Sequence, residues 1–305
     1  MYYEIYGEAI RQLEKYLVSG IAAVGKEGLN NFLEITCIVL LVNPAHSTCL
    51  NKRKELVEQG LLKERDELKI TAALQLRAEG AKSSILWHHR RWLLRRLYQK
   101  NSQQGDTPDN TDTLDDCTIA LDDLAEELSV ATTASEIYPR NYHAWLHRYK
   151  CMQSMIAAYG NASNASSSQL TREALAQMLR AEEFMVSRWI DVNVSDYTAA
   201  QYLCHAYRMM EENRIDHIQV HSESELDGTA PINPQSPKSP FSPLMHAEDL
   251  VERYPTHEAL WYYLRAAYAA QPKGSKGLLH VEGKQGTYAD NFRRWLEGFE
   301  CREMA

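Results

Sequence analysis

Apolar side chains recur along this chain at the three- and four-residue spacing of α-helices, and the alternation typical of β-strands is nearly absent. One stripe of such a helix is formed by Tyr142, Trp145, Tyr149 and Met152. Asn141 stands directly before this stripe, and asparagine is a favourable residue for capping a helix start. The sequence therefore predicts a helix that begins after Asn141 and buries the stripe.

Further segments with helical spacing precede the copies of this pattern and are expected to supply a partner helix for each. They cover residues 31–42, 118–134 and 171–189. The apolar run 35–42 is far shorter than the roughly 20 residues that a bilayer-spanning helix needs. We therefore expect buried helix pairs and no membrane span.

A short pattern at the start of the second helix of each pair returns five times along the chain. Its best copies are residues 141–148, 82–92 and 257–265, and residues 43–53 and 196–202 are eroded copies. Self-similarity of this kind is the sequence signature of a solenoid, in which helix pairs stack into one continuous core. The fold class predicted is all-α, an α-α superhelix of helix-turn-helix repeats that forms a single domain over residues 1–305.

The tryptophan of the pattern defines one anchor position in every copy. The anchor positions are Leu50, Trp87, Trp145, Ala200 and Trp261. The intervals between them are unequal because polar inserts lengthen the later ones. Without the inserts, each interval is about 40 residues, the size of one helix-turn-helix repeat.

The predicted inserts cover about residues 101–116, 160–169 and 222–243. The last is rich in proline, serine and charge, and it cannot bury enough apolar surface to fold alone. We therefore expect disordered inserts. The Ser-Pro steps in residues 222–243 leave two interpretations open, namely a site of proline-directed phosphorylation and a plain solvated loop.

Large and cationic side chains of the pattern are predicted to pack between repeats. The expected packing residues are Trp87, Arg90, Trp145, Arg148 and Trp261. Arg148 follows Trp145 by three positions on the same helix, so its stem can lie beside the indole.

The chain is acidic, with a formal net charge of −8 and a pI of about 5.8, which argues against general nucleic-acid binding. One basic cluster within residues 88–96 is an exception, and it is followed by an acidic segment at residues 115–127. Charge pairing between neighbouring helices and an anion-facing surface both explain this cluster.

The cysteines indicate no metal site. The six cysteines are scattered, and none lies in a Cys-x-x-Cys pair or in a Cys/His group with zinc spacing. This usage and the absence of a signal-peptide pattern predict a reducing, cytoplasmic location. Cys301 lies too far from Ala305 to form a Cys-a-a-X ending, so we do not expect this chain to be prenylated by that rule.

The pattern Asn-Tyr-x-x-Trp-x-x-Arg on the second helix of a pair resembles the protein prenyltransferase α-subunit repeat. Residues 82–92 and 140–148 look like the second and third repeats of farnesyltransferase and type I geranylgeranyltransferase α-subunits. The resemblance covers about residues 30–270. The long inserts and eroded copies look more like the divergent repeat-containing branch, which is similar to the α-partner in a third type of geranylgeranyltransferase.

This resemblance implies a division of labour between two subunits. The α-subunit is a right-handed crescent of helix pairs around a β-subunit, an α-α barrel that holds the zinc, the isoprenoid pocket and most of the peptide site. The implied function is therefore an α-type subunit that assists transfer of a geranylgeranyl or farnesyl group from its diphosphate to a protein substrate with a C-terminal cysteine. No cofactor is expected on this chain, and no activity is expected from it alone.

The resemblance also implies site residues. Lys82 matches a catalytic lysine near the diphosphate, and Asn141, Tyr142 and His143 match a trio near the diphosphate and the peptide. Lys82 can equally be an ordinary helix-start lysine, and His143 an ordinary surface histidine. A non-catalytic α-solenoid adaptor is the alternative function, and it gains if Lys82 and the trio face different surfaces.

The chain departs from the family pattern at several positions. Ser83 and Ser84 replace the Asn-Tyr pair of the second repeat, while Leu50 and Ala200 replace the tryptophan of the first and fourth. These changes concern the choice of β-subunit and substrate more than the fold.

Overall fold

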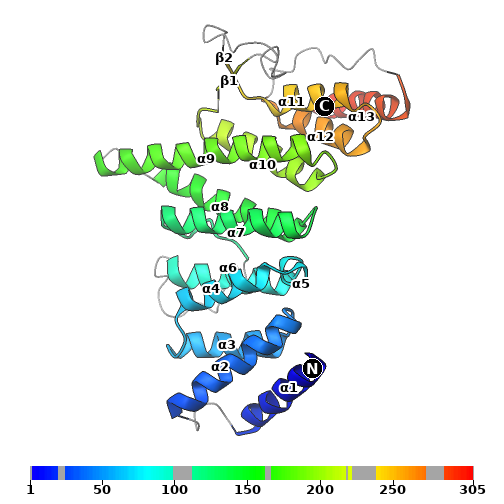
Figure 1. The fold of residues 1–305 in the computed structure, drawn as a ribbon. Helices are drawn as coiled ribbons and strands as arrows, with labels where there is room; N and C mark the ends of the chain where they lie inside the picture. Colours follow the sequence, from blue (N-terminus) through cyan, green and yellow to red (C-terminus); the bar gives the residue numbers. More distant parts are fainter. Residues whose placement is uncertain are drawn as a thin grey trace. The chain divides into compact units, whose positions relative to one another are not determined.

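The fold is seen in a computed structural model, which describes residues 2–19, 25–98, 112–161, 166–217, 219–221, 238–272 and 285–304. The described residues form thirteen helices and one short ribbon of two strands, which confirms the all-α class (Figure 1). Their contacts divide the chain into two compact units, Met1–Ser154 and Met155–Ala305. The single continuous domain and the crescent expected over residues 1–305 stay predictions.

The first unit stacks helix pairs in chain order. Its helices are α1 (Tyr2–Ser19), α2 (Gly25–Val42), α3 (Ser47–Glu58), α4 (Glu64–Gln75), α5 (Ala78–Ala81), α6 (Ser84–Tyr98), α7 (Leu121–Ile137) and the first part of α8 (Tyr142–Asn161). Contacts join α1 to α2, α2 to α3 and α4 to α6. The second helices of the pairs, α3, α6 and α8, begin at the first three copies of the repeated pattern, as the sequence predicts.

Two apolar clusters form the core of the first unit. Phe32, Leu50 and Leu86 belong to the first cluster, which joins α2, α3 and α6. The second surrounds Trp87, whose side chain is fully buried against small residues of α5, α7 and α8. Gly80 permits a close approach there, because a Cβ atom would lie 2.0 Å from the carbonyl oxygen of Leu74.

The second unit continues the pairing with its own core. Its elements are α9 (Ser166–Val192), α10 (Tyr197–Glu212), β1 (Gln219–His221), β2 (Lys238–Pro240), α11 (Pro243–Arg253), α12 (Glu258–Ala270) and α13 (Thr287–Met304). Helix α10 packs on α9 and α12, and α12 also packs on α11 and α13. The strands pair antiparallel, with Val220 opposite Ser239. Trp261 is buried against Phe292 of α13, with ring centroids 5.9 Å apart, so α13 covers the last repeat.

The predicted inserts are shorter in the structure than in the sequence analysis. Residues 112–116 are packed, residues 166–169 belong to α9, and residues 238–243 form β2 and the start of α11. Single apolar side chains explain the difference, because Leu114 and Phe241 are buried although their neighbours in the sequence are polar. The remaining insert residues, 101–111, 162–165 and 222–237, lie outside the described residues.

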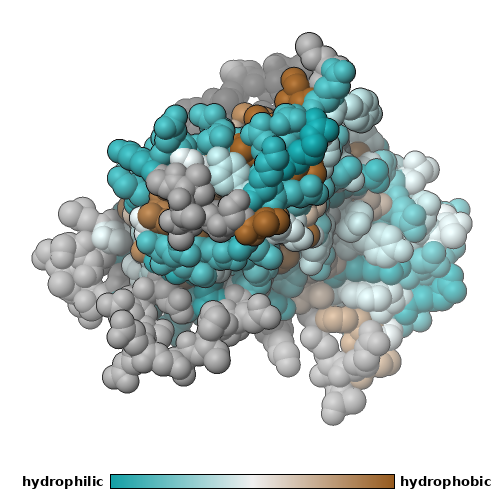
Figure 2. Space-filling view, turned by 90° about the horizontal axis from the view of Figure 1, so that it is seen from below, coloured by the Kyte–Doolittle hydropathy of each residue, from teal (hydrophilic) through white to brown (hydrophobic). Residues whose placement is uncertain are grey.

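No helix within the described ranges is both long enough and apolar enough to cross a bilayer. Figure 2 shows the face seen from below in Figure 1, on which hydrophilic side chains predominate and hydrophobic ones are scattered. Scattered apolar side chains are normal on a protein surface and mark no interaction site by themselves.

Candidate functional site

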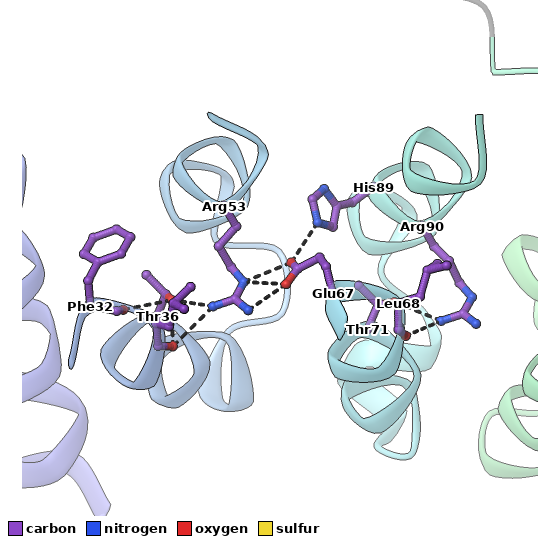
Figure 3. Close-up of polar contacts among 9 residues, drawn as sticks. Phe32, Thr36, Arg53, Glu67, Leu68, Thr71, His89 and Arg90 are labelled. Atoms are coloured by element: carbon purple, nitrogen blue, oxygen red, sulfur yellow. Dashed lines mark hydrogen bonds and ion pairs between the residues drawn. The ribbon is translucent and has the colours of Figure 1, made fainter. Parts of the chain in front are cut away.

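Buried arginines connect successive helix pairs of the first unit. Arg53, Arg90 and Arg148 each follow the anchor position by three residues. The Nη1 of Arg53 donates to the carbonyl oxygen of Leu33, at 3.2 Å, and to Oγ1 of Thr36, at 2.7 Å (Figure 3). Arg90 and Arg148 donate in the same way to a leucine carbonyl and a threonine hydroxyl of their own pair. The contact is therefore a repeated feature of the array.

The other edge of the guanidinium binds a glutamate of the following pair. Nη2 of Arg53 lies 2.6 Å from Oε2 of Glu67, and Nε2 of His89 lies 2.9 Å from Oε1 of the same carboxylate (Figure 3). The next link repeats this arrangement, with Nε of Arg90 2.6 Å and Nε2 of His147 2.8 Å from Oε2 of Glu127. We call these six residues, Arg53, Glu67, His89, Arg90, Glu127 and His147, the Arg-Glu-His network.

The network is buried, and its charges are balanced. Burial would raise the pKa of Glu67, but hydrogen bonds from His89 and Arg53 and the charge of Arg53 hold it at about 2. The pKa of Glu127 is about 2 because the charge of Arg90 and hydrogen bonding by His147 outweigh burial. Burial lowers the pKa of both histidines, so each is a neutral imidazole that donates from Nε2 to an ionised carboxylate.

The residues predicted to pack between repeats are buried, each within its own unit. The indoles of Trp87, Trp145 and Trp261 are buried. The guanidinium of Arg148 lies 5.5 Å from the Trp145 ring centroid, where the sequence analysis places it.

Within the basic cluster, Arg90 pairs with Glu127 of the next helix pair, as the charge-pairing interpretation of this cluster expects. The sequence analysis missed the glutamates and histidines of the network. They could have been found because a glutamate and a histidine recur at equivalent places in the second and third repeats.

Asn141 occupies the centre of the expected site, and its side chain is fully engaged. Its Nδ2 donates to the carbonyl oxygen of Ala81 at 2.8 Å and to that of Ala134 at 3.3 Å, while Oδ1 accepts from the N–H of Ala144. The indole of Trp87 donates to the same Ala81 oxygen at 2.7 Å. The buried amide of Asn141 thus holds backbone, and both of its N–H groups are engaged. The expected substrate contact of Asn141 stays a prediction.

Lys82 follows Ala81 directly and is exposed at the C-cap of α5. The Asn141 contact with Ala81 therefore brings the backbone at Lys82 next to the start of α8. Ser83, which stands where the family has asparagine, keeps the capping contact: its Oγ accepts from the N–H of Leu86 at 3.3 Å. The replacement of asparagine by serine thus preserves the helix start.

The other two members of the trio are accessible. The Tyr142 side chain is 60% exposed, and its ring meets that of His143 edge-on at 5.5 Å between centroids. His143 is partly buried, and its pKa is lowered first by burial and then by the positive charge of Arg91. The contact of Asn141 with Ala81 therefore places the backbone of Lys82 next to the start of α8, which carries Tyr142 and His143. We call this place the junction between the second and third pairs.

A carboxylate from the first insert also reaches this region. Asp112 binds Arg91 through two hydrogen bonds of 2.6 Å, and Asp116 lies 3.7 Å from Arg95. The sequence analysis missed Asp112 because it assigned residues 101–116 to a disordered insert. The acidic segment beside the basic cluster was the available signal.

Two buried thiols of the first unit have raised pKa values. Burial raises the pKa of Cys49 and of Cys117 to about 12, so both stay protonated at neutral pH. Within the described ranges, no group of three or more histidine, cysteine or acidic side chains is arranged to hold a metal ion. Cys49 and Cys117 behave as small apolar residues.

Comparisons with known proteins agree with this architecture. Residues 124–155, in α7 and α8, match the family described as "Protein prenyltransferase alpha subunit repeat". The chain is 31% identical over 247 residues to "Protein prenyltransferase alpha subunit repeat-containing protein 1" of Danio rerio. The aligned region covers 77% of this chain and 54% of that protein. The protein of that name in Homo sapiens is 28% identical over 264 residues, covering 81% of this chain and 61% of the relative.

The chain spans little more than half the length of these curated relatives, and their names state a repeat and no reaction. The matched segment contains Glu127 and Asn141, which carry contacts between repeats, and the anchor Trp145. The chain therefore carries the protein prenyltransferase α-subunit repeat and resembles the repeat-containing branch of that family.

Proposed function

We propose that this chain is the α-type subunit of a heterodimeric protein prenyltransferase in the cytoplasm. It would assist transfer of a geranylgeranyl group, or a farnesyl group, from its diphosphate to the cysteine of a protein substrate. The observation that supports this most is the junction at Ala81, whose carbonyl oxygen binds both Trp87 and Asn141. This contact joins the backbone that precedes Lys82 to the start of the helix that carries the trio, which supports the proposal of a shared substrate site.

The residues at the junction suit different tasks. Lys82 is an exposed ammonium that can donate to diphosphate oxygens and stabilise the negative charge that develops as the diphosphate leaves. Tyr142 and His143 present polar ring atoms at the start of α8, where a peptide or diphosphate oxygen could be bound. Asn141 acts indirectly, because it holds the backbone that carries Lys82 and starts the helix that carries Tyr142.

The partner we propose is a β-subunit, an α-α barrel that holds the zinc. Zinc there would lower the pKa of the substrate thiol and present a thiolate to the isoprenoid. Four exposed apolar side chains lie at or next to the ends of helices α4, α6, α7 and α8, namely Leu76, Ile85, Tyr138 and Tyr142. We propose that another subunit covers them.

Reconstitution tests the proposal. The chain is co-purified with candidate β-subunits and assayed with labelled geranylgeranyl diphosphate, farnesyl diphosphate and proteins that end in cysteine motifs. We expect turnover by a heterodimer and none by the isolated chain. Robust turnover by the chain alone would contradict the division of labour, and a stable complex that never transfers a lipid would favour the adaptor alternative.

Lys82→Ala gives the residue-level test. An oxyanion-type donor contributes about 10²–10³ in rate, so the variant heterodimer should slow markedly while it still assembles. Lys69→Ala is the matched control, because Lys69 is an exposed lysine of α4 that pairs only loosely with Asp66 at 3.6 Å. A wild-type rate from Lys82→Ala in an active heterodimer would refute the role given to Lys82.

A further inference from the structure

The guanidinium of Arg91 in α6 is buried but incompletely satisfied. Its side chain is only 4% exposed. Nε and Nη2 each donate to one oxygen of Asp112, whereas Nη1 has no hydrogen-bond partner among the described residues. A buried donor left without an acceptor is costly, and each such group in a native protein calls for an explanation. Arg91 therefore has capacity for another acceptor.

Asp112 forms the ion pair with Arg91 on the side that faces solvent. Its side chain is 36% exposed, so water reaches the ion pair where the carboxylate lies. Behind it the chain is fixed, because Leu114 is fully buried and the carbonyl oxygen of Cys117 accepts from the hydroxyl of Ser154 at 2.8 Å. The carboxylate of Asp112 can thus turn away from Arg91 without loss of the packing that follows it.

Arg91 and Arg95 lie one turn apart on α6, and both pair with carboxylates of the segment that follows α6. Arg91 acts electrostatically on His88 of the same helix and on His143 of the expected trio, and Arg95 lies one turn further along α6. The nearby negative charges are Asp112 and Asp116, both from the segment that follows α6. In this arrangement Asp112 stands where an external anion would bind.

We propose that Arg91 is an oxyanion-binding residue and that Asp112 is its intrachain competitor, which a diphosphate group displaces. A guanidinium binds phosphate oxygens with the same two-pronged geometry that it uses for a carboxylate. A diphosphate carries more negative charge than one carboxylate. Once Asp112 has turned away, the diphosphate also offers a further acceptor for the buried Nη1, which has no partner among the described residues. The inference rests on the proposed function for the identity of the ligand, the isoprenoid diphosphate, but the site itself can be tested without transfer activity.

Calorimetric titration of the full chain with inorganic pyrophosphate tests the competition. Asp112→Asn keeps the shape of the side chain and removes its charge, so pyrophosphate should bind about tenfold more tightly than to the wild type. Asp66→Asn is the matched control, because it removes one carboxylate from an exposed pair on α4. Equal affinities of Asp112→Asn and the wild type would overturn the proposal.

A second variant assigns the binding to Arg91. Adding Arg91→Gln to Asp112→Asn should abolish the gain, and Arg11→Gln in the same background, which removes an exposed arginine of α1, should leave it unchanged. If Arg91→Gln does not fold, Arg91→Lys keeps the charge and loses the two-pronged geometry, so most of the gain should again disappear. Undiminished pyrophosphate binding by the folded Arg91 variant would refute the assignment.

Different ligands separate this inference from the proposed function. Geranylgeranyl diphosphate and pyrophosphate should both gain affinity from Asp112→Asn if the diphosphate group is what Arg91 binds. A gain with pyrophosphate alone supports a site for free anions and overturns the isoprenoid assignment. If Asp112→Asn gains affinity for both ligands but no heterodimer transfers a lipid, the result supports the diphosphate site and contradicts the proposed function.

Discussion

The two units build the same helix-pair interior with different chemistry. In the first, the second helix of each pair carries an arginine three residues after the anchor position, and in α6 and α8 a histidine directly precedes this arginine. Arg53, His89, Arg90 and His147 bind buried glutamates. In the second, Leu203 and Leu264 take the arginine positions and are fully buried. Tyr202 and Tyr263 take the histidine positions, and the Tyr202 hydroxyl donates to Glu182 at 2.7 Å. The helix-pair arrangement therefore does not depend on the ion pairs.

The difference shows what the Arg-Glu-His network contributes. Replacing a buried ion pair by apolar residues is often neutral or stabilising, so stability alone does not explain why the first unit keeps the network. Its hydrogen bonds are directional, and they hold each pair at one register on the next. The first unit also carries Lys82 and the trio, so we infer that the network positions the residues of the proposed site.

The largest expected effect comes from cutting the network. Glu127→Ala leaves Arg90 and His147 buried without their carboxylate, and breaking a buried pair in this way costs about 3–5 kcal/mol. Urea denaturation measures the loss. Glu126→Ala is the control, because Glu126 is the exposed neighbour on the same helix. Similar losses for the two variants would contradict the contrast drawn between the units.

The same glutamates predict acid sensitivity of the first unit. The folded pKa of Glu67 and of Glu127 is about 2, below the usual value of about 4.3, so each stabilises the fold fully above that value. This stabilisation is lost as the pH falls from about 4.3 towards 2. In Glu127→Ala the acid-induced loss should be smaller than in the wild type, as urea midpoints at several acidic pH values would show.

An intermediate effect is expected at the Ala81 junction. Asn141→Ser keeps a capping oxygen, as Ser83 does for α6, but it removes the donors to Ala81 and Ala134, which costs about 1–3 kcal/mol for two hydrogen bonds. If Asn141 positions Lys82, transfer by the heterodimer should slow as well, because Lys82 loses its support. Ser83→Ala, which removes a cap alone, is the control. A wild-type transfer rate from Asn141→Ser would restrict Asn141 to a role in stability.

The smallest effect is expected in the second unit and has the opposite dependence on pH. His217 lies between Glu183 and Glu211, and its pKa is raised because these carboxylates outweigh burial. A raised pKa means that its stabilisation is complete below about pH 6.5 and is lost as the pH rises through the folded pKa. His217→Gln should therefore cost about 1–2 kcal/mol near pH 6 and less at alkaline pH.

His205, which lies in α10, provides the comparison, because burial lowers its pKa. Thermal melts of His217→Gln and His205→Gln at pH 6 and pH 9 test whether the stability lost in each variant falls or rises with pH. A loss in His217→Gln that is independent of pH would show that its charge does not stabilise the second unit.

Local signals in the sequence determined the helices, the anchor positions and the repeat. Trp87, Trp145 and Trp261 are buried as their spacing predicts, because one face of a helix follows from positions a few residues apart. The family match at residues 124–155 depends on the same local pattern.

Only the tertiary structure decided which charges meet. Glu127 binds Arg90 and His147, and Asp112 binds Arg91, across sequence separations that no helical periodicity encodes. Such pairs form when packing removes water from side chains that the solenoid brings together, so each partner is set by the stacking of helix pairs. The sequence by itself thus determined the repeat, whereas the tertiary structure decided which residues form the charge network and that Asp112 is the partner of Arg91.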